Sequence, residues 1–309
     1  MQRIVLDCDP GHDDAIAILL AAHAPALRLE AITTVAGNQT VEKTTRNALR
    51  VCTLAGIRSV PIARGMDRPL VRAQRVAADI HGESGLDGPS LPEPDLQLAP
   101  IHAVDLLIEL LLASAGDLTV VATGPLTNIA TAIRREPRIV PKIQRIVLMG
   151  GSMGLGNTTP AAEFNIYVDP EAAHIVFSCG CPVTMLGLDV THQAQATPRV
   201  RKRIRALNTP VARLVDDLLE FFAHTYREVF GFTAPPLHDP CAVAHVIDPT
   251  LLRHQPMRVD VELRGEWTTG RTVCDRYGVS GRPSNAEVGL AIDVPRFWDL
   301  LIATLATYQ

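Results

Sequence analysis

Apolar positions along the chain form short runs that alternate with longer segments of helical periodicity. The short runs are rich in Val, Ile and Leu and predict buried β-strands at Arg3–Leu6, Leu29–Val35, Leu118–Ala122, Ile143–Met149 and Val183–Leu186. The segments between them predict helices at Asp13–Ala22, Val41–Ala55, Ala103–Ala115, Leu126–Arg135 and Pro170–Ser178. This alternation is typical of the α/β class, with an open, mostly parallel, Rossmann-like sheet flanked by helices.

The second half of the chain has a different pattern. Helical periodicity dominates residues 198–230, β-rich runs follow at Met257–Val261 and Thr272–Asp275, and a closing helix is expected from about Pro295. No repeat or low-complexity linker interrupts the sequence. We therefore expect one domain over residues 1–309, with a helical insertion at about 198–230 and a small β-rich segment at about 257–275.

Composition narrows the class of protein. The chain has 309 residues, 47% of them hydrophobic, and a net charge of −4, which allows a large core. Its basic residues are scattered, so no nucleic-acid partner is expected. No apolar run is long enough to span a membrane, and the chain does not begin with a signal-like segment. The six cysteines form no CxxC pair, and Cys179-Gly-Cys181 has no nearby ligand partner. We expect reduced packing cysteines in a cytoplasmic protein with no membrane partner.

The densest chemical signal is an acidic cluster near the start, Asp7-Cys-Asp9-Pro-Gly-His-Asp13-Asp14. It joins the first predicted strand to the first predicted helix, where open α/β sheets bind ligands. Capping of the helix would explain Asp13 or Asp14, but not Asp7 and Asp9 as well. Because no Lys or Arg is interleaved, a bound cation is the simplest way to offset the repulsion among the carboxylates. The cluster therefore predicts a metal site.

Further polar groups follow the other predicted strands. Taken one at a time they have ordinary explanations, because Asn38 suits a turn, His81 suits a surface loop and Asp239 suits a helix cap. Several of them fall at the same topological position, however, which favours convergence on one ligand. The set comprises Asn38, Thr123, Met149, Asn157, Glu163, Phe164 and Asn165, together with His81 in a glycine-rich loop and His238-Asp239 before the helical run Cys241–Val246.

These motifs resemble those of the nucleoside hydrolases, in particular the inosine–uridine and pyrimidine nucleoside-preferring group. The resemblance runs from about Arg3 to about Val294 and is most specific in Asp7–Asp14, Val35–Asn38, Met149–Gly151, Pro160–Asn165 and His238-Asp239. It implies the nucleoside hydrolase fold and a calcium-dependent N-ribosyl hydrolase that releases ribose and a free base. It also implies a role in nucleoside salvage and a homotetramer or dimer whose only other partner is a small-molecule ribonucleoside.

The resemblance also implies roles for individual residues. Asp9, Asp14, Asp239 and the Thr123 carbonyl match Ca²⁺ ligands, and Asp9 also matches the general base. Asp13, Asn38 and Asn165 match groups around the ribose hydroxyls, whereas Asn157 and Glu163 match contacts to the 5′-hydroxyl. His81 and His238 match residues beside the base, with His238 as the proton donor to the leaving group. Met149, Phe164, Tyr226 and Phe230 are expected to complete the substrate site.

Physical chemistry agrees with this set of roles. An all-oxygen ligand shell suits Ca²⁺ better than a softer ion, and a weakly polarising ion still needs a carboxylate base. For the base, the resemblance implies that the His at position 238 favours pyrimidine nucleosides (uridine, cytidine) over purines, while Tyr226 leaves a broad inosine–uridine specificity open. Two readings from other classes remain, a haloacid-dehalogenase-type phosphatase built on Asp7-Cys-Asp9 and a non-catalytic nucleoside-binding protein.

Overall fold

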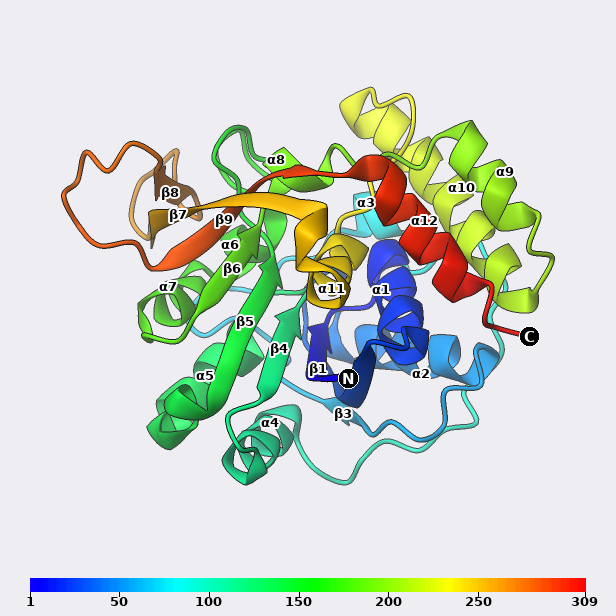
Figure 1. Cartoon of the computed structure of the whole chain (residues 1–309), viewed down its shortest axis with the longest axis horizontal. Coiled ribbons are helices and arrows are strands. Elements are labelled where there is room, and N and C mark those ends of the chain that lie inside the picture. Colours follow the sequence, from blue (N-terminus) through cyan, green and yellow to red (C-terminus); the bar gives the residue numbers. More distant parts are fainter.

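A nine-stranded sheet runs through the centre of the protein in the computed structural model, which describes residues 1–309 (Figure 1). Its order is β3-β2-β1-β4-β5-β6-β9-β7-β8. The first seven strands in this order are parallel, and β7 and β8 pair antiparallel at one edge. The strands are β1 (Gln2–Cys8), β2 (Leu27–Thr34), β3 (Ile62–Arg64), β4 (Leu118–Ala122), β5 (Ile143–Met149), β6 (Val183–Leu186), β7 (Leu252–Val261), β8 (Thr272–Asp275) and β9 (Ala286–Ile292).

Helices cover both faces of the sheet. One face packs α1 (His12–His23), α2 (Val41–Leu54), α11 (Asp239–Ile247) and α12 (Val294–Leu305), with α9 (Pro198–Arg205) and α10 (Pro210–Phe230) beyond them. The other face packs α4 (Ala103–Ala113), α5 (Thr127–Arg135) and α7 (Pro170–Ser178). The short helices are α3 (Ala78–His81), α6 (Phe164–Val168) and α8 (Leu188–Thr191), with 3-10 turns at Pro137–Lys142 and Pro249–Leu251.

Alternation along β1 divides the core between these two faces. Ile4 and Leu6 point into the larger core cluster with α1, whereas Val5 points into the smaller cluster on the opposite face. Helix α1 is buried around most of its surface and holds ten buried residues, so its apolar composition needs no polar face. The strand order reverses direction between β1 and β4, which is where sheets of this type open a ligand crevice beyond the carboxyl ends of their strands.

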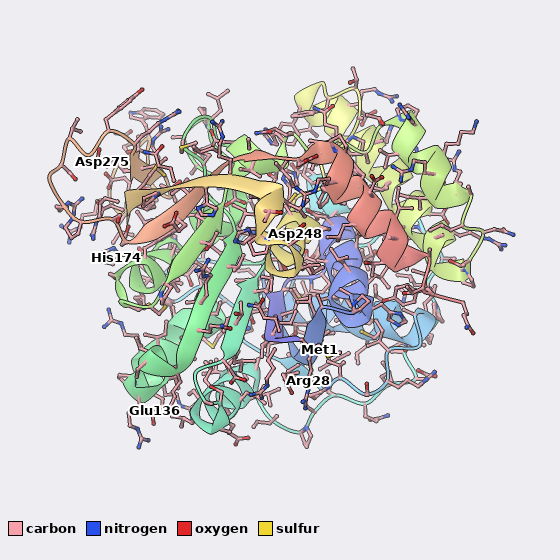
Figure 2. The ribbon with its side chains drawn as sticks, in the orientation of Figure 1. Met1, Arg28, Glu136, His174, Asp248 and Asp275 are labelled. Atoms are coloured by element: carbon pink, nitrogen blue, oxygen red, sulfur yellow. The ribbon has the colours of Figure 1, made fainter.

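The structure confirms the α/β class and the mostly parallel sheet. Three predicted strands have the expected bounds, and β1 and β2 differ from prediction by one or two residues at their ends. The prediction missed the short edge strand β3, which pairs with β2. It also missed β9, which pairs with β6 and β7 and thereby joins the β-rich segment to the main sheet. No helix of the structure combines the length and apolar character that crossing a bilayer requires. Charged side chains such as Glu136 and Asp275 project from the periphery (Figure 2).

Candidate active site

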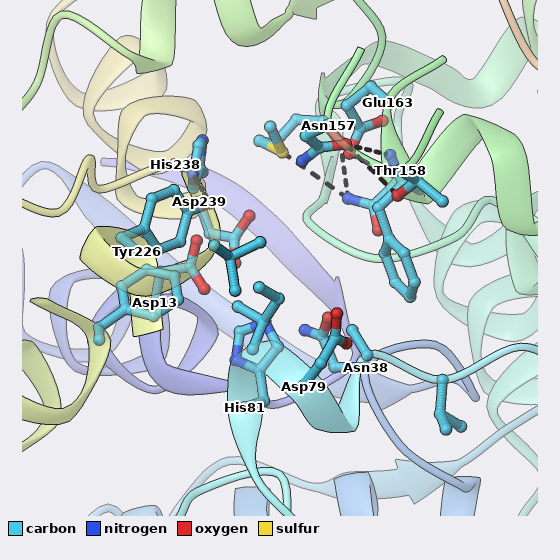
Figure 3. A pocket seen from close by; sticks show the side chains of 18 of the residues that line it. Asp13, Asn38, Asp79, His81, Asn157, Thr158, Glu163, Tyr226, His238 and Asp239 are labelled. Atoms are coloured by element: carbon cyan, nitrogen blue, oxygen red, sulfur yellow. Dashed lines mark hydrogen bonds between the residues drawn. The ribbon is translucent and has the colours of Figure 1, made fainter. Parts of the chain in front are cut away.

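A cavity of about 220 Å³ lies beyond the carboxyl ends of the parallel strands. Asp13, Asp239, Tyr226 and His238 lie on one side of it, and Asn157 and Glu163 lie on the opposite side (Figure 3). Its lining contains all of the site residues predicted from the sequence except two: Asp13, Asn38, His81, Thr123, Met149, Asn157, Glu163, Phe164, Asn165, Tyr226, Phe230, His238 and Asp239. The two exceptions, Asp9 and Asp14, are fully buried.

Asp9 follows β1 and is tightly enclosed. Its Oδ2 accepts a hydrogen bond from the main-chain N–H of Asn38 at 2.7 Å, while its Oδ1 is buried without a hydrogen-bond partner. A Cβ at Gly37 would lie 2.1 Å from Oδ2, and one at Gly124 would lie 2.7 Å from Oδ1. Both glycines are therefore needed for the loops after β2 and β4 to approach the carboxylate. Burial and the neighbouring charge of Asp14 raise the pKa of Asp9 well above its usual range.

Three more carboxylates gather beside Asp9. One carboxylate oxygen from each of Asp13, Asp14 and Asp239 lies within 4.8 Å of the others. Asp14 is held in place by its Oδ1, which accepts from the Thr123 hydroxyl at 2.8 Å, and by its Oδ2, which accepts from the Gly11 N–H at 3.1 Å. Asp14 thus also caps α1, as one reading of the sequence anticipated. Burial, followed by the charge of Asp14, raises the pKa of Asp13 to about 7.

The spatial cluster differs in one member from the ligand set implied by the resemblance. It includes Asp13, which was assigned to the ribose, and it does not include Asp9. Asp9 is nevertheless close enough to influence the cluster. Burial is the largest cause of the raised pKa of Asp239, and the charges of Asp13, Asp14 and Asp9 raise it further. The Thr123 carbonyl accepts a hydrogen bond from Asn165 Nδ2 at 2.8 Å and keeps a second lone pair available.

The residues present suit a hard cation. Asp9 Oδ1 is an orphaned buried carboxylate oxygen, and the only Lys or Arg lining the cavity is the exposed Arg75. Every candidate metal-ligand atom in the cluster is a carboxylate oxygen, and the cluster includes no Cys or His. Such a set can hold a divalent ion that prefers carboxylate and carbonyl oxygens, and the ion would offset the mutual repulsion of the carboxylates. Asp7 also has a buried carboxylate oxygen without a partner, Oδ2, and its Oδ1 accepts from Thr33 Oγ1 and Asn128 Nδ2 at 2.5 and 2.7 Å. Unlike Asp9, it is not among the charges that raise the pKa of Asp239, so we separate it from the set.

His238 sits at the amino end of α11 with both ring nitrogens engaged. Its Nδ1 lies 2.7 Å from the Thr191 hydroxyl, and its Nε2 lies 2.6 Å from the Tyr226 hydroxyl. Burial, together with the neighbouring ring of His192, lowers the pKa of His238 well below its usual value. Tyr226 is brought here by α10, whose Phe230 also lines the cavity. Thr191 could not be identified from local pattern, because its partner His238 is 47 residues away in the chain.

His81 is positioned by His12, which follows Gly11 in the acidic motif. Its Nδ1 lies 3.1 Å from Nδ1 of His12 and 3.3 Å from the His12 main-chain nitrogen. The opposite nitrogen of His12, Nε2, donates to the main-chain carbonyl of Asp87 at 2.9 Å. The His12 ring also stacks on Phe221 and Phe222. His81 therefore meets the cavity with its Nε2 free of hydrogen bonds within the chain.

The opposite wall is built around Glu163, which caps α6. Its Oε1 accepts from the Asn165 N–H at 2.9 Å, and its Oε2 accepts from the Gly151 N–H at 2.8 Å and the Ile166 N–H at 3.2 Å. Burial raises the pKa of Glu163 to about 7 despite these bonds. Asn157 is fixed by the Phe164 N–H, which donates to its Oδ1 at 2.9 Å.

Several lining residues were not singled out from the sequence. Most of them lie in the segment before His81 or on α10, and Thr158 follows Asn157 in the loop after β5. The set consists of Arg75, Val76, Ala77, Asp79, Ile80, Thr158, Phe222 and Val229. Phe222 is buried in the helix layer and also lines the cavity. The segment before His81 carries no periodic signal that would have placed it at the site.

Comparison with known proteins adds an independent line of evidence. Residues 4–299 match the model of the family described as inosine-uridine preferring nucleoside hydrolase. The chain is 52% identical over 306 residues to the pyrimidine-specific ribonucleoside hydrolase RihA of Shewanella sp. (strain ANA-3), covering 99% of this chain and 96% of the relative. The corresponding RihA of Citrobacter koseri is 51% identical over 306 residues, covering 99% and 98%.

The solved structures show the same likeness in three dimensions. The purine-preferring ribonucleoside hydrolase from Gardnerella vaginalis superposes with a TM-score of 0.93 at 36% identity, covering 99% of this chain and 98% of that one. Proteins of the same fold thus carry names with opposite base preferences, so the fold alone does not determine which base is preferred.

Proposed function

The chain belongs to the inosine-uridine preferring nucleoside hydrolase family and is an N-ribosyl hydrolase, and within that activity we propose that it is a Ca²⁺-dependent enzyme with a preference for pyrimidine ribonucleosides. The phosphatase alternative falls with this family membership. The observation that carries the proposal is the cavity itself, where a buried carboxylate cluster and a Tyr–His pair line the same wall of a space for a ligand, opposite Asn157 and Glu163.

The ion would be held by Asp9, Asp14, Asp239 and the Thr123 carbonyl, with Asp13 beside them. Three carboxylates, a carbonyl and exchangeable water suit the 6–8 oxygen ligands that Ca²⁺ takes, in a shell that tolerates irregular geometry. When bound, the ion supplies a Lewis acid that lowers the pKa of a coordinated water molecule and accepts ribose hydroxyl oxygens. The orphaned Oδ1 of Asp9 is the feature of this chain that most calls for such a partner.

The remaining polar residues hold the sugar from two sides. We assign Asp13, Asn38 and Asn165 to the ribose 2′- and 3′-hydroxyls, and Asn157 and Glu163 to the 5′-hydroxyl. Asn38 and Asn165 are rigid, because their amide nitrogens donate to Asp9, Asp14, Thr123 and Met149 oxygens. A prearranged set of this kind orients the glycosidic bond without further ordering cost.

Cleavage of the glycosidic bond needs a base on one side and a proton donor on the other. Asp9 takes the proton of the attacking water, and the surrounding carboxylates stabilise the positive charge that develops on the sugar. Tyr226 and His238 share a 2.6 Å hydrogen bond and both line the cavity, on the wall that also holds Asp13 and Asp239. We assign protonation of the departing base to this pair. Because burial lowers the pKa of His238, a proton on its ring is weakly held, and the Tyr226 hydroxyl would pass it on to the base.

Base preference is assigned to the rings around the base. His81 offers a free Nε2, Tyr226 and Phe230 offer ring faces and a hydroxyl, and the relatives at 51–52% identity are named pyrimidine-specific. A broad inosine–uridine specificity is the alternative. We also propose, from the resemblance alone, a single-domain chain that acts in cytoplasmic nucleoside salvage and assembles as a dimer or tetramer, which light scattering of the purified protein would measure.

The direct test is a comparison of kcat/KM for uridine, cytidine, inosine and adenosine, each with added Ca²⁺ and after treatment with a chelator. The proposal expects uridine and cytidine to exceed both purine nucleosides by at least about tenfold, which corresponds to about 1.4 kcal/mol of transition-state discrimination. Equal values for uridine and inosine would contradict the pyrimidine preference while leaving the hydrolase activity intact.

A further inference from the structure

Two cysteines outside the active site face each other at the end of α7. Cys179 and Cys181 are separated by Gly180, and their Sγ atoms lie 3.0 Å apart. This separation is shorter than simple van der Waals contact between two sulfur atoms and is compatible with an S–H···S hydrogen bond. All six cysteines of the chain are free thiols. The other four have no partner thiol within hydrogen-bond distance, so this pair is unlike the rest.

The local backbone explains why the two thiols meet. Cys179 ends α7 in a right-handed helical conformation, and its N–H donates to the Val176 carbonyl. Gly180 then takes φ +91°, a conformation that L side chains rarely adopt, although a Cβ there would meet nothing within 4 Å. The glycine is thus required by the turn rather than by crowding. The turn brings both cysteine side chains to the same side before Pro182 leads into β6.

The two thiols differ in their surroundings. Cys181 is buried in the core cluster that covers the α7 face of the sheet, whereas Cys179 is only partly buried against the same cluster. A hydrogen bond from the Cys181 side chain is the largest influence on Cys179 and lowers the pKa of its thiol to about 7. Burial raises this pKa, and a hydrogen bond from the Cys181 main chain lowers it further. The carboxyl end of α7 carries a partial negative charge, which disfavours a thiolate at Cys179, so the hydrogen bonds from Cys181 are needed to stabilise that thiolate. Cys179 is the accessible thiol, and Cys181 is the protected one behind it.

We propose that Cys179 and Cys181 form an oxidisable dithiol that closes a reversible intrachain disulfide with a small-molecule disulfide, such as oxidised glutathione, as the oxidant. The Cys179 thiolate attacks one sulfur of the small disulfide, forming a mixed disulfide and releasing one thiolate. The Cys181 thiolate then attacks the Cys179 sulfur and releases the second thiolate. The two protein thiols are oxidised, the small disulfide is reduced to two thiols, and the two S–H protons go to the released thiolates.

The position of the pair makes this chemistry separable from nucleoside hydrolysis. The dithiol precedes β6 at the amino edge of the parallel strands, while the cavity lies beyond their carboxyl ends. Neither cysteine lines the cavity, and the grouped metal-ligand candidates of the chain are aspartates only. The inference therefore does not depend on the proposed substrate or ion. Oxidation is expected to leave uridine hydrolysis unchanged.

The test equilibrates the reduced full-length protein in buffers of increasing oxidised-to-reduced glutathione ratio. Acid quenching, alkylation of the remaining thiols and mass spectrometry of the peptide that carries both cysteines then report the products. The expected product is that peptide two hydrogens lighter and without alkyl groups, restored by dithiothreitol. Cys8, Cys52 and Cys241, which are fully buried, are expected to remain thiols throughout.

Variants separate the two roles. C181S should trap glutathione on Cys179 as a stable mixed disulfide, because no second thiol can displace it. C179S should slow the reaction of the native protein with oxidised glutathione by about tenfold or more, because the accessible thiolate is gone. C274S is the matched control, since Cys274 is also partly buried but has no partner thiol, and it should behave like the wild type.

Three results would overturn the proposal. The first is a wild-type protein that accumulates the glutathione mixed disulfide on Cys179 without losing both thiols. The second is a dithiol that stays reduced even in oxidised glutathione alone, in a protein that remains active on uridine. The third is loss of uridine hydrolysis on oxidation that dithiothreitol reverses, which would overturn the part of the proposal that separates the pair from the cavity.

Discussion

Replacing Asp9 with asparagine removes one buried negative charge while keeping the shape of the side chain. The asparagine carbonyl can still accept the hydrogen bond that the Asn38 N–H donates to Asp9 Oδ2 at 2.7 Å. The amide nitrogen then takes the place of Oδ1, the oxygen that has no partner within the chain. The substitution therefore removes a metal ligand and a proton acceptor at one atom, with little change in packing.

The expected size of the effect follows from these two losses. A positioned general base contributes about 10²–10⁴-fold to rate, or about 2.7–5.4 kcal/mol, and loss of an ion ligand adds to this. Stability should move the other way in metal-free protein. Asp9 is fully buried and repelled by Asp14, so a neutral residue relieves an unfavourable charge. We expect kcat/KM on uridine to fall at least about 100-fold, with no decrease in the Tm of the chelated protein.

Asp7→Asn is the matched control. Asp7 is equally buried, lies two residues away and keeps its Oδ1 hydrogen bonds from Thr33 and Asn128 in the amide form. Steady-state rates on uridine and differential scanning fluorimetry in a chelator measure both variants. The reasoning fails if Asp9→Asn keeps more than about a tenth of wild-type activity, or if Asp7→Asn loses as much activity as Asp9→Asn.

Three further predictions use other parts of the site. Tyr226→Phe should slow uridine cleavage by about tenfold or more but change cleavage of p-nitrophenyl riboside much less, because that leaving group needs no proton; equal losses would remove Tyr226 from proton transfer. Gly37→Ala would place a Cβ 2.1 Å from Asp9 Oδ2, so urea denaturation should show a loss of about 1–3 kcal/mol along with lost activity, and a wild-type profile would refute the tight enclosure of Asp9. Burial raises the pKa of Glu163 from 4.5 to about 7, so its contribution to stability is full below pH 4.5 and is lost as the pH rises through 7. Glu163→Gln should therefore flatten that part of the curve of unfolding free energy against pH. An unchanged slope would contradict the assignment.

Hydrophobic periodicity was enough to predict the sheet class, because the central parallel strands β1, β4, β5 and β6 are apolar runs that are largely buried. It failed for β3, which has only three residues, and for β9, whose seven residues include two Ala and a Gly and look weak as a strand. That strand is specified by its neighbours, since it pairs with β6 on one side and β7 on the other. Long-range pairing of this kind is not encoded in local pattern.

The residues of the site were easier to predict from the sequence than the residues that hold them in place. Asp9, Asn38 and Thr123 each follow a strand, so their convergence could be expected from topology alone. Their roles remain predictions. The supporting contacts of His12 with His81 and of Thr191 with His238 join residues 69 and 47 positions apart, and no spacing rule connects them.

The most direct test of the account is a calorimetric titration of chelator-treated protein with Ca²⁺, run in parallel with the uridine assay on the same samples. We predict one Ca²⁺ per chain, restored hydrolysis in proportion to occupancy, and loss of both in Asp239→Asn, which removes a charge from the aspartate cluster. Full uridine turnover by exhaustively chelated protein, with no heat of Ca²⁺ binding, would contradict the central claim that the buried aspartates hold a divalent ion.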